Sequence, residues 1–289
     1  MDQIKEILTR HSIPSIVDIH VHFMPDNVMS KVRQYFDSAG PLLGRSWPIK
    51  YRDDDATRIA QLKEFGVSRF SALNYAHRSG MAKWLNEWSR DFAKIDKAII
   101  SSATIYPDDD VYEYTKEAIE GGAEVFKVHI QVGEFSPIDE KLIPAWHLLE
   151  ESRTPVVIHA GSGPAPGRYT GVGLVRQLLD IFPNLTLVIA HMGMPEYREF
   201  IELSQKYENV YLDTTMVLTP FTEETTPLGE DNARVISDLS EKIVFGSDFP
   251  NIPHEYVVAI ESLESAGFSS TWMRNVLFET PTRLLGARS

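Results

Sequence analysis

Six of the nine histidines stand at or just past the ends of short apolar runs typical of buried β-strands. These six are His20, His22, His77, His129, His159 and His191. Scattered surface histidines would fall mostly in helices and loops, as His11, His147 and His254 do. If the strands close into a parallel barrel, their carboxyl ends meet at one mouth. The histidines therefore predict a site of metal binding or proton transfer at that mouth.

His20 and His22 are separated by one residue on the first predicted strand. This spacing places both imidazoles on the same face of the strand. Two neutral imidazoles directed at one point supply half of a zinc-type site. Alone, such a pair could instead cap the barrel core through hydrogen bonds. The turn at Pro25 and the distant partner residues favour the metal site.

Three more residues could complete this site. His159 and His191 each end an apolar run and are followed by a glycine-containing element. Burying an imidazole there costs free energy unless it is hydrogen-bonded or bound to a metal. Asp248 follows the last predicted strand, where its carboxylate could bind the metal or accept a proton. A turn or helix-cap role is the structural alternative for Asp248.

Lys127 and His129 share one face of a predicted strand by the same two-residue spacing. A lysine that points into a barrel is costly to bury unless it is paired or modified. Lys127 could contact an anionic substrate, carry a carbamate that bridges two metals, or pair with an acid such as Glu124 or Asp213. Arg168, in a glycine-rich loop, could grip a substrate carboxylate with its guanidinium. The side chains at the mouth that we expect to contact substrate are Lys127, His129, His77 and Arg168.

Eight strand-like runs alternate with amphipathic helical segments along the chain. The predicted strands are 16–22, 68–75, 98–106, 124–130, 155–159, 186–191, 210–213 and 243–246. Several are apolar throughout, as strands buried on both faces are. With 289 residues, the pattern predicts an α/β fold, a (β/α)8 TIM barrel that forms one domain over residues 1–289. An open doubly wound sheet would instead show a glycine-rich phosphate turn after its first strand, and none is present.

Three loops have the composition of insertions or lids: Gly40–Asp55, Gly161–Gly173 and Leu218–Asp231. The second and third follow the fifth and seventh strands, on the face where barrel enzymes keep their active sites.

Composition excludes several classes of protein. The chain has no cysteine, which excludes a thiol nucleophile, cysteine-ligated zinc and disulfides. A net charge of −13 gives no basic footprint for nucleic acid. No apolar run is long enough to span a membrane, and the N-terminus lacks a signal-peptide core. We expect a cytoplasmic protein whose partner is a small-molecule substrate, and a homo-oligomer is compatible with the sequence.

The motifs, taken in order, resemble the amidohydrolase superfamily, and more narrowly its amidohydrolase 2 branch. That branch includes α-amino-β-carboxymuconate semialdehyde decarboxylase and related aromatic-acid decarboxylases. Four motifs carry the resemblance: His-x-His on strand 1, a histidine ending strand 5, another ending strand 6, and Gly-Ser-Asp-x-Pro after strand 8. They extend from Ile16 to Pro250 and so cover most of the chain.

The resemblance implies His20, His22, His159 and Asp248 as ligands of a divalent metal. It implies that His191 orients or deprotonates the attacking water, and that Asp248 also shuttles a proton. A second metal would need a carboxylated lysine at Lys127. One metal is usual in this branch, and zinc is the expected ion.

The leading hypothesis is a metal-dependent hydrolase that uses activated water on a C–N or C–O bond of a small, carboxylate-bearing substrate. The alternative is non-oxidative decarboxylation of an unsaturated or aromatic acid at the same site. A metal-free lactonase-type variant is disfavoured by the intact histidine set. A binding module without catalytic activity is disfavoured because the residues expected to transfer protons are also present.

Overall fold

The computed structural model describes residues 2–286 and contains a ring of parallel β-strands. The strands are β1 Ile16–Asp18, β2 Val67–Ser71, β3 Ile99–Ile100, β4 Ser102–Thr104, β5 Val125–His129, β6 Val156–His159, β7 Leu187–Ile189, β8 Val210–Asp213 and β9 Ile243–Val244. One residue interrupts β3 and β4, which together occupy a single position in the ring. The ring therefore has eight positions, and the predicted (β/α)8 barrel is confirmed.

The ring closes between its first and last strands. The backbone N–H of Ile19 donates to the carbonyl of Phe245 at 3.0 Å, and Val21 forms a parallel bridge with Phe249. Just beyond β1, the N–H of Asp248 donates to the carbonyl of His20 at 2.9 Å. Residues from the two ends of the chain are thereby held side by side at the barrel mouth.

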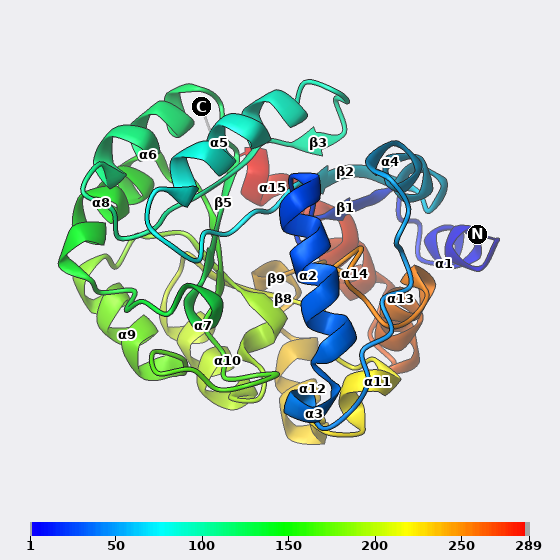
Figure 1. Ribbon diagram of the computed structural model, residues 1–289. Coiled ribbons are helices and arrows are strands. Elements are labelled where there is room, and N and C mark those ends of the chain that lie inside the picture. Colours follow the sequence, from blue (N-terminus) through cyan, green and yellow to red (C-terminus); the bar gives the residue numbers. More distant parts are fainter. Residues whose placement is uncertain (1, 287–289) are drawn as a thin grey trace.

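The helices surround the barrel (Figure 1). They are α1 Asp2–Arg10, α2 Asp26–Ser38, α3 Gly40–Leu43, α4 Asp55–Glu64, α5 Met81–Phe92, α6 Val111–Glu120, α7 Ile130–Gly133, η1 Glu140–Leu142, α8 Ile143–Ser152, α9 Val172–Ile181, η2 Ala190–Gly193, α10 Tyr197–Lys206, α11 Pro220–Glu223, α12 Glu230–Ser237, η3 Ser240–Lys242, α13 Tyr256–Ser265, α14 Ser270–Arg274, η4 Asn275–Glu279 and α15 Thr280–Gly286. In Figure 1, α2 crosses in front of the strands and leads to α3, which lies near α11.

Most strand residues are apolar because both faces of the barrel sheet are buried. One face packs against the surrounding helices. The other fills the barrel interior with a second apolar cluster that includes Val17, Val125, Val157 and Val244. Lys127 shares the inward face of β5 with Val125 and is fully buried. The barrel thus carries a charged side chain in its interior, directly below the mouth.

Several strands end earlier than the sequence predicts, and two of these ends shape the site. β1 ends at Asp18, so His20 and His22 lie in the irregular segment that follows it, where the hydroxyl of Ser71 accepts the N–H of Val21 at 2.9 Å. β7 ends at Ile189, and His191 lies in the turn η2. After β1 the N–H of Val21 donates to the side chain of Ser71, and after β7 the N–H of His191 donates to the side chain of Asp213. These side-chain acceptors take the place of backbone carbonyls, so each strand ends early.

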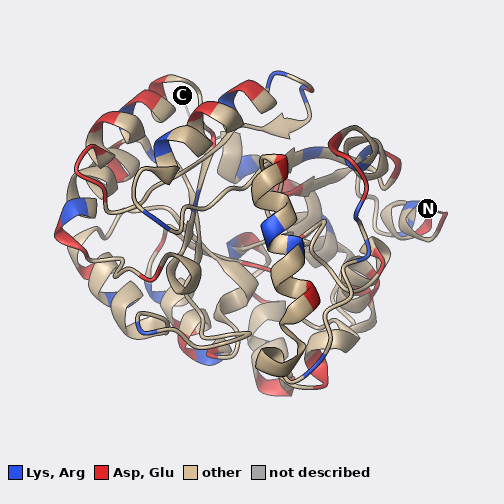
Figure 2. Ribbon diagram, in the orientation of Figure 1, with Lys and Arg blue, Asp and Glu red and all other residues tan. Residues whose placement is uncertain are grey.

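Charged residues lie mostly on the outer helices and loops (Figure 2). Helix α2 carries lysine and arginine in its middle and aspartate near both ends. Among residues 2–286, no helix combines the length and apolar character needed to cross a membrane.

Candidate active site

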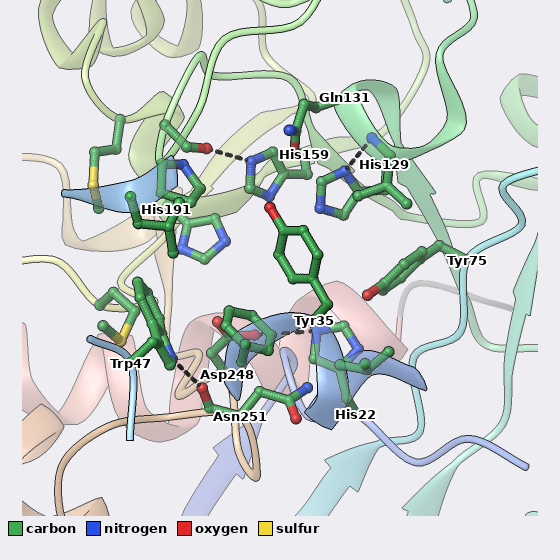
Figure 3. A pocket seen from close by; sticks show the side chains of 18 of the residues that line it. His22, Tyr35, Trp47, Tyr75, His129, Gln131, His159, His191, Asp248 and Asn251 are labelled. Atoms are coloured by element: carbon green, nitrogen blue, oxygen red, sulfur yellow. Dashed lines mark hydrogen bonds and ion pairs between the residues drawn. The ribbon is translucent and has the colours of Figure 1, made fainter. Parts of the chain in front are cut away.

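A pocket of about 590 Å³ opens at the barrel mouth. Its floor is formed by side chains at the ends of the strands, including His20, His22, Lys127, His159 and Asp248. Its outer wall comes from α2, α3, the loop that follows α3, and α11. Figure 3 shows the histidines gathered around this space. The predicted convergence of distant residues at the mouth is therefore observed.

His20, His22 and Asp248 form the group best placed to hold a metal. One potential ligand atom from each lies within 4.8 Å of those of the other two. Oδ1 of Asp248 lies 3.1 Å from Nε2 of His22 and 3.8 Å from Nε2 of His20. Two donors bound to one tetrahedral zinc at about 2.0–2.1 Å would lie roughly 3.3 Å apart. The spacing of the three side chains is compatible with a shared cation.

The outer nitrogens of both histidines are already engaged. Nδ1 of His20 donates to Oδ2 of Asp213 at 2.7 Å, and Nδ1 of His22 donates to the carbonyl of Leu73 at 3.0 Å. Such contacts fix the tautomer of a metal-binding histidine and orient its ring. They leave Nε2 of a neutral ring as a lone-pair donor facing Asp248. Two acceptors this close need a proton or a cation between them, so the donor set fits a metal.

Burial and charge set the protonation state of this group. Burial alone would raise the pKa of Asp248, but the hydrogen bond with His22 and the neighbouring imidazoles hold that pKa well below its ordinary value. Burial and the Lys127 ammonium lower the pKa of His20 well below its ordinary value. An ionised carboxylate and a neutral imidazole are the forms that bind a metal.

Lys127 lies against the same group. Its Nζ donates to Nε2 of His20 at 3.1 Å, so a metal ion bound at Nε2 would replace this hydrogen bond. Burial lowers the pKa of Lys127 to about 8, although the negative charges of Asp213 and Asp248 oppose this shift. Glu124 is not its partner, because Glu124 pairs with Arg69 at 2.6 Å. Lys127 therefore contacts His20, and the charges of Asp213 and Asp248 act on its ammonium. These contacts are compatible with the role of a lysine paired with acids.

His191 lies beside this group but is held differently. Its backbone adopts a left-handed conformation with φ 55°, and Asp248 does so with φ 67°. Such conformations are uncommon outside glycine and persist where the surroundings enforce them. The N–H of His191 donates to Oδ1 of Asp213 at 2.7 Å, and its Nδ1 donates to the carbonyl of Thr215 at 3.1 Å. Asp213 therefore positions both His20 and His191.

His159 lines the pocket but is not a member of the compact group formed by His20, His22 and Asp248. Its Nε2 donates a hydrogen bond to the carbonyl of Gly163 at 2.8 Å. Nδ1 of the neutral ring therefore carries the lone pair that could bind a metal. The ring stacks on His129 with centroids 4.0 Å apart and lies 4.8 Å from the ring of His191. His159 thus faces the pocket beside His129 and His191.

The four side chains expected to contact substrate occupy different places. Lys127 and His129 line the floor, and His77 lines the pocket from an exposed position. Arg168 is exposed and absent from the pocket lining, with its guanidinium 5.1 Å from the ring of Tyr169. The glycine-rich loop turns outward at that point, so Arg168 lies apart from the site.

Most residues of the outer wall could not be predicted from the sequence. The residues concerned are Lys31, Tyr35, Phe36, Arg45, Trp47, Phe221 and Asn251. Most of them come from α2 and from the loop that follows α3. The amphipathic pattern of α2 is that of an ordinary surface helix. The glycine- and proline-rich composition of Gly40–Asp55 did predict a lid, and Arg45 and Trp47 lie within it.

Comparison with known proteins agrees with this geometry. The model of the Amidohydro_2 family of amidohydrolases matches residues 17–287. The chain therefore belongs to this amidohydrolase family, and the predicted resemblance is confirmed. No curated protein matches it.

Solved structures of similar fold include an uncharacterised TIM-barrel protein from Bordetella bronchiseptica, 18% identical with a TM-score of 0.74, which covers 94% of this chain and 98% of its own. A candidate 2-pyrone-4,6-dicarboxylic acid hydrolase from Acinetobacter baumannii, solved with citric acid bound, is 16% identical with a TM-score of 0.62 over 94% and 99% of the two chains. A further candidate hydrolase of this kind, from Pseudomonas putida, is 16% identical with a TM-score of 0.63 over 94% and 98%. At these identities the likeness shows the fold alone.

Proposed function

We propose that this amidohydrolase is a metal-dependent hydrolase that cleaves a C–N or C–O bond of a small, carboxylate-bearing molecule. The observation that carries the proposal is the compact group of His20, His22 and Asp248 at the base of the pocket, with His191 beside it. Family membership supports an enzyme that binds a divalent metal.

His20, His22 and Asp248 would hold one divalent ion, and His159 is proposed as a further ligand through its free Nδ1. Two imidazoles and a carboxylate suit zinc better than magnesium, which prefers oxygen ligands. When bound, such an ion lowers the pKa of water to about 7 and so supplies a nucleophile near neutral pH.

His191 is the proposed general base. Because its Nδ1 donates to Thr215, its Nε2 carries the lone pair and can accept a proton from the attacking water. Burial lowers the pKa of His191, which keeps the ring neutral and ready to accept that proton. Asp248, whose carboxylate is ionised at rest, is proposed to accept this proton from His191 and to pass it to the leaving group.

Substrate carboxylate binding is assigned to the outer wall in place of Arg168. Lys31 on α2 lines the pocket, and none of the described residues forms an ion pair or hydrogen bond with its ammonium. Arg45 also lines the pocket, but Glu224 already neutralises it at 3.0 Å. The names of two neighbouring structures, with a dicarboxylic acid substrate and bound citric acid, support an acidic ligand.

Elemental analysis of protein purified without chelators, followed by a hydrolysis screen, tests this function. We expect one zinc per chain and turnover of at least one small acid amide, ester or lactone, which is lost after chelation and restored by zinc. Absence of any stoichiometric transition metal would contradict the proposal. Release of CO2 without addition of water would instead identify the decarboxylase.

A further inference from the structure

Three separate segments meet over the pocket as an aromatic cap, consisting of Phe36, Trp47 and Phe221. The ring of Trp47 lies 5.2 Å from that of Phe36 on α2 and 4.8 Å from that of Phe221 on α11. All three side chains line the pocket. Aromatic rings bind apolar and aromatic groups through their faces and edges. One face of Phe221 is covered by Arg45, whose guanidinium lies 3.7 Å from the ring centroid. The remaining ring surface of the cap offers apolar contacts above the charged floor.

Asn251 links this cap to the proposed metal group. Its backbone carbonyl accepts the indole N–H of Trp47 at 2.7 Å, and its backbone N–H donates to the carbonyl of Asp248 at 2.9 Å. In Figure 3 the side chain of Asn251 lies between those of Asp248 and His22. Asn251 thus stands where the aromatic cap meets the floor.

The side-chain amide of Asn251 forms no hydrogen bond with any described residue. The residue is only 3% exposed, yet its Oδ1 has no hydrogen-bond partner, and Nδ2 makes no hydrogen bond with any described residue. A buried polar group that is left unpaired destabilises the protein. Because Asn251 lines the pocket, a ligand bound there could supply the hydrogen-bond partner that its amide lacks.

We propose that Asn251 is a specificity-determining residue, which hydrogen-bonds an N–H group next to the bond that is broken, while the aromatic cap holds a ring attached to it. The inference rests on the proposed hydrolase function and narrows its substrate class to N-acyl amides that carry an aromatic group and a carboxylate. Oδ1 accepts the substrate N–H, and Nδ2 is left to donate to a carbonyl oxygen. An ester presents an oxygen in place of that N–H and leaves Oδ1 unpaired.

A matched pair of ligands tests the amide preference. N-benzoylglycine and benzoyloxyacetic acid differ only in N–H against oxygen, and N-acetylglycine lacks the ring. Stopped-flow tryptophan fluorescence, with Trp47 as the reporter, measures each Kd before any turnover. In the wild-type protein we expect the amide to bind about 10-fold tighter than the ester, the discrimination typical of one lost hydrogen bond to a buried group.

Asn251→Leu should abolish the preference for the amide. Because the amide makes no hydrogen bond within the protein, this variant should keep or raise Tm, whereas a structural role would lower it. Phe221→Ala should weaken the two benzoyl ligands equally and leave N-acetylglycine unchanged. Trp47→Phe, which removes the reporter indole, should lose the fluorescence signal.

Three results would overturn the inference: no binding of N-benzoylglycine at millimolar concentration, equal affinity of the wild-type protein for amide and ester, or an unchanged preference in Asn251→Leu. The readout is binding and does not require turnover. Bound but unhydrolysed N-benzoylglycine would therefore count against the hydrolase function alone.

Discussion

Among single residues, the histidines that we propose as metal ligands differ from the histidine that we propose as a general base in where Nε2 lies. His20 and His22 direct Nε2 at Asp248, within a few ångströms of its carboxylate. His191 is fixed through backbone and carbonyl contacts and stands outside that group. This difference in placement is the basis on which we propose two roles for the same side-chain type.

His191→Ala should separate these roles. We expect turnover to fall by about 10²–10⁴-fold, the usual contribution of a general base, while the zinc content stays close to one per chain. His22→Ala should lose both zinc and activity. Elemental analysis alongside steady-state kinetics distinguishes the two variants. If His191→Ala empties the site as thoroughly as His22→Ala, His191 is a ligand.

Lys31→Gln should weaken the binding of acidic substrates. Removing the ammonium of this pocket-lining side chain should raise KM for a carboxylate substrate about 10-fold or more and leave KM for its methyl ester unchanged, because hydrogen bonds to charged groups contribute about 1.5–3 kcal/mol. Arg168→Gln is the matched control and should change neither value, since Arg168 lies outside the pocket. An effect of Arg168→Gln equal to that of Lys31→Gln would contradict this assignment.

At the scale of the elements, sequence patterns predicted the strands better than the cap. The run before His159 is apolar on both faces and the run before His129 is apolar except for Lys127, so the strands and the mouth residues could be predicted from them. The cap could not, because Phe36 and Trp47 meet Phe221 only after folding and α2 has the composition of a surface helix. The early ends of β1 and β7 depend on side-chain oxygens such as that of Asp213, which no local pattern reveals.

Gly246 is required where the loop after β9 passes the first strand. A Cβ at this position would lie 2.3 Å from Oγ1 of Thr215 and 2.7 Å from Cβ of His20. Gly246→Ala should therefore displace His20, reduce zinc affinity and destabilise the fold by about 1–3 kcal/mol. Urea unfolding and zinc titration measure the two effects.

Gly173→Ala is the control for that substitution. A Cβ on Gly173, near the start of α9, would have no neighbour within 4 Å. This variant should be neutral or stabilise the protein by up to about 1 kcal/mol, because alanine is the better helix residue. Equal behaviour of Gly246→Ala and Gly173→Ala would show that the close approach at His20 is tolerated.

For the whole molecule, the barrel concentrates titratable groups that the unfolded chain keeps apart. The pKa values of four buried imidazoles, those of His20, His129, His159 and His191, are lowered, primarily by burial. Burial acts in the opposite direction on one carboxyl group and raises the pKa of Asp18 to about 7. The stability of the metal-free protein at acidic pH is set by this balance.

Below pH 6.5 the unfolded chain protonates these four imidazoles while the folded protein keeps them neutral. Unfolding then takes up protons, so the stability that these groups provide is complete above pH 6.5 and is lost as pH falls towards their folded pKa values. Asp18 binds one proton in the folded state over part of this range and offsets one of the four.

The free energy of unfolding of chelator-treated protein should therefore fall between pH 6.5 and 5 by more than the 1.4 kcal/mol per pH unit of a single proton, an order-of-magnitude figure. Urea unfolding across this range should show the slope reduced in His129→Gln and unchanged in His147→Gln, whose side chain is on the exposed surface of α8. A pH-independent free energy of unfolding would mean that the imidazoles are as readily protonated in the folded barrel as in the unfolded chain.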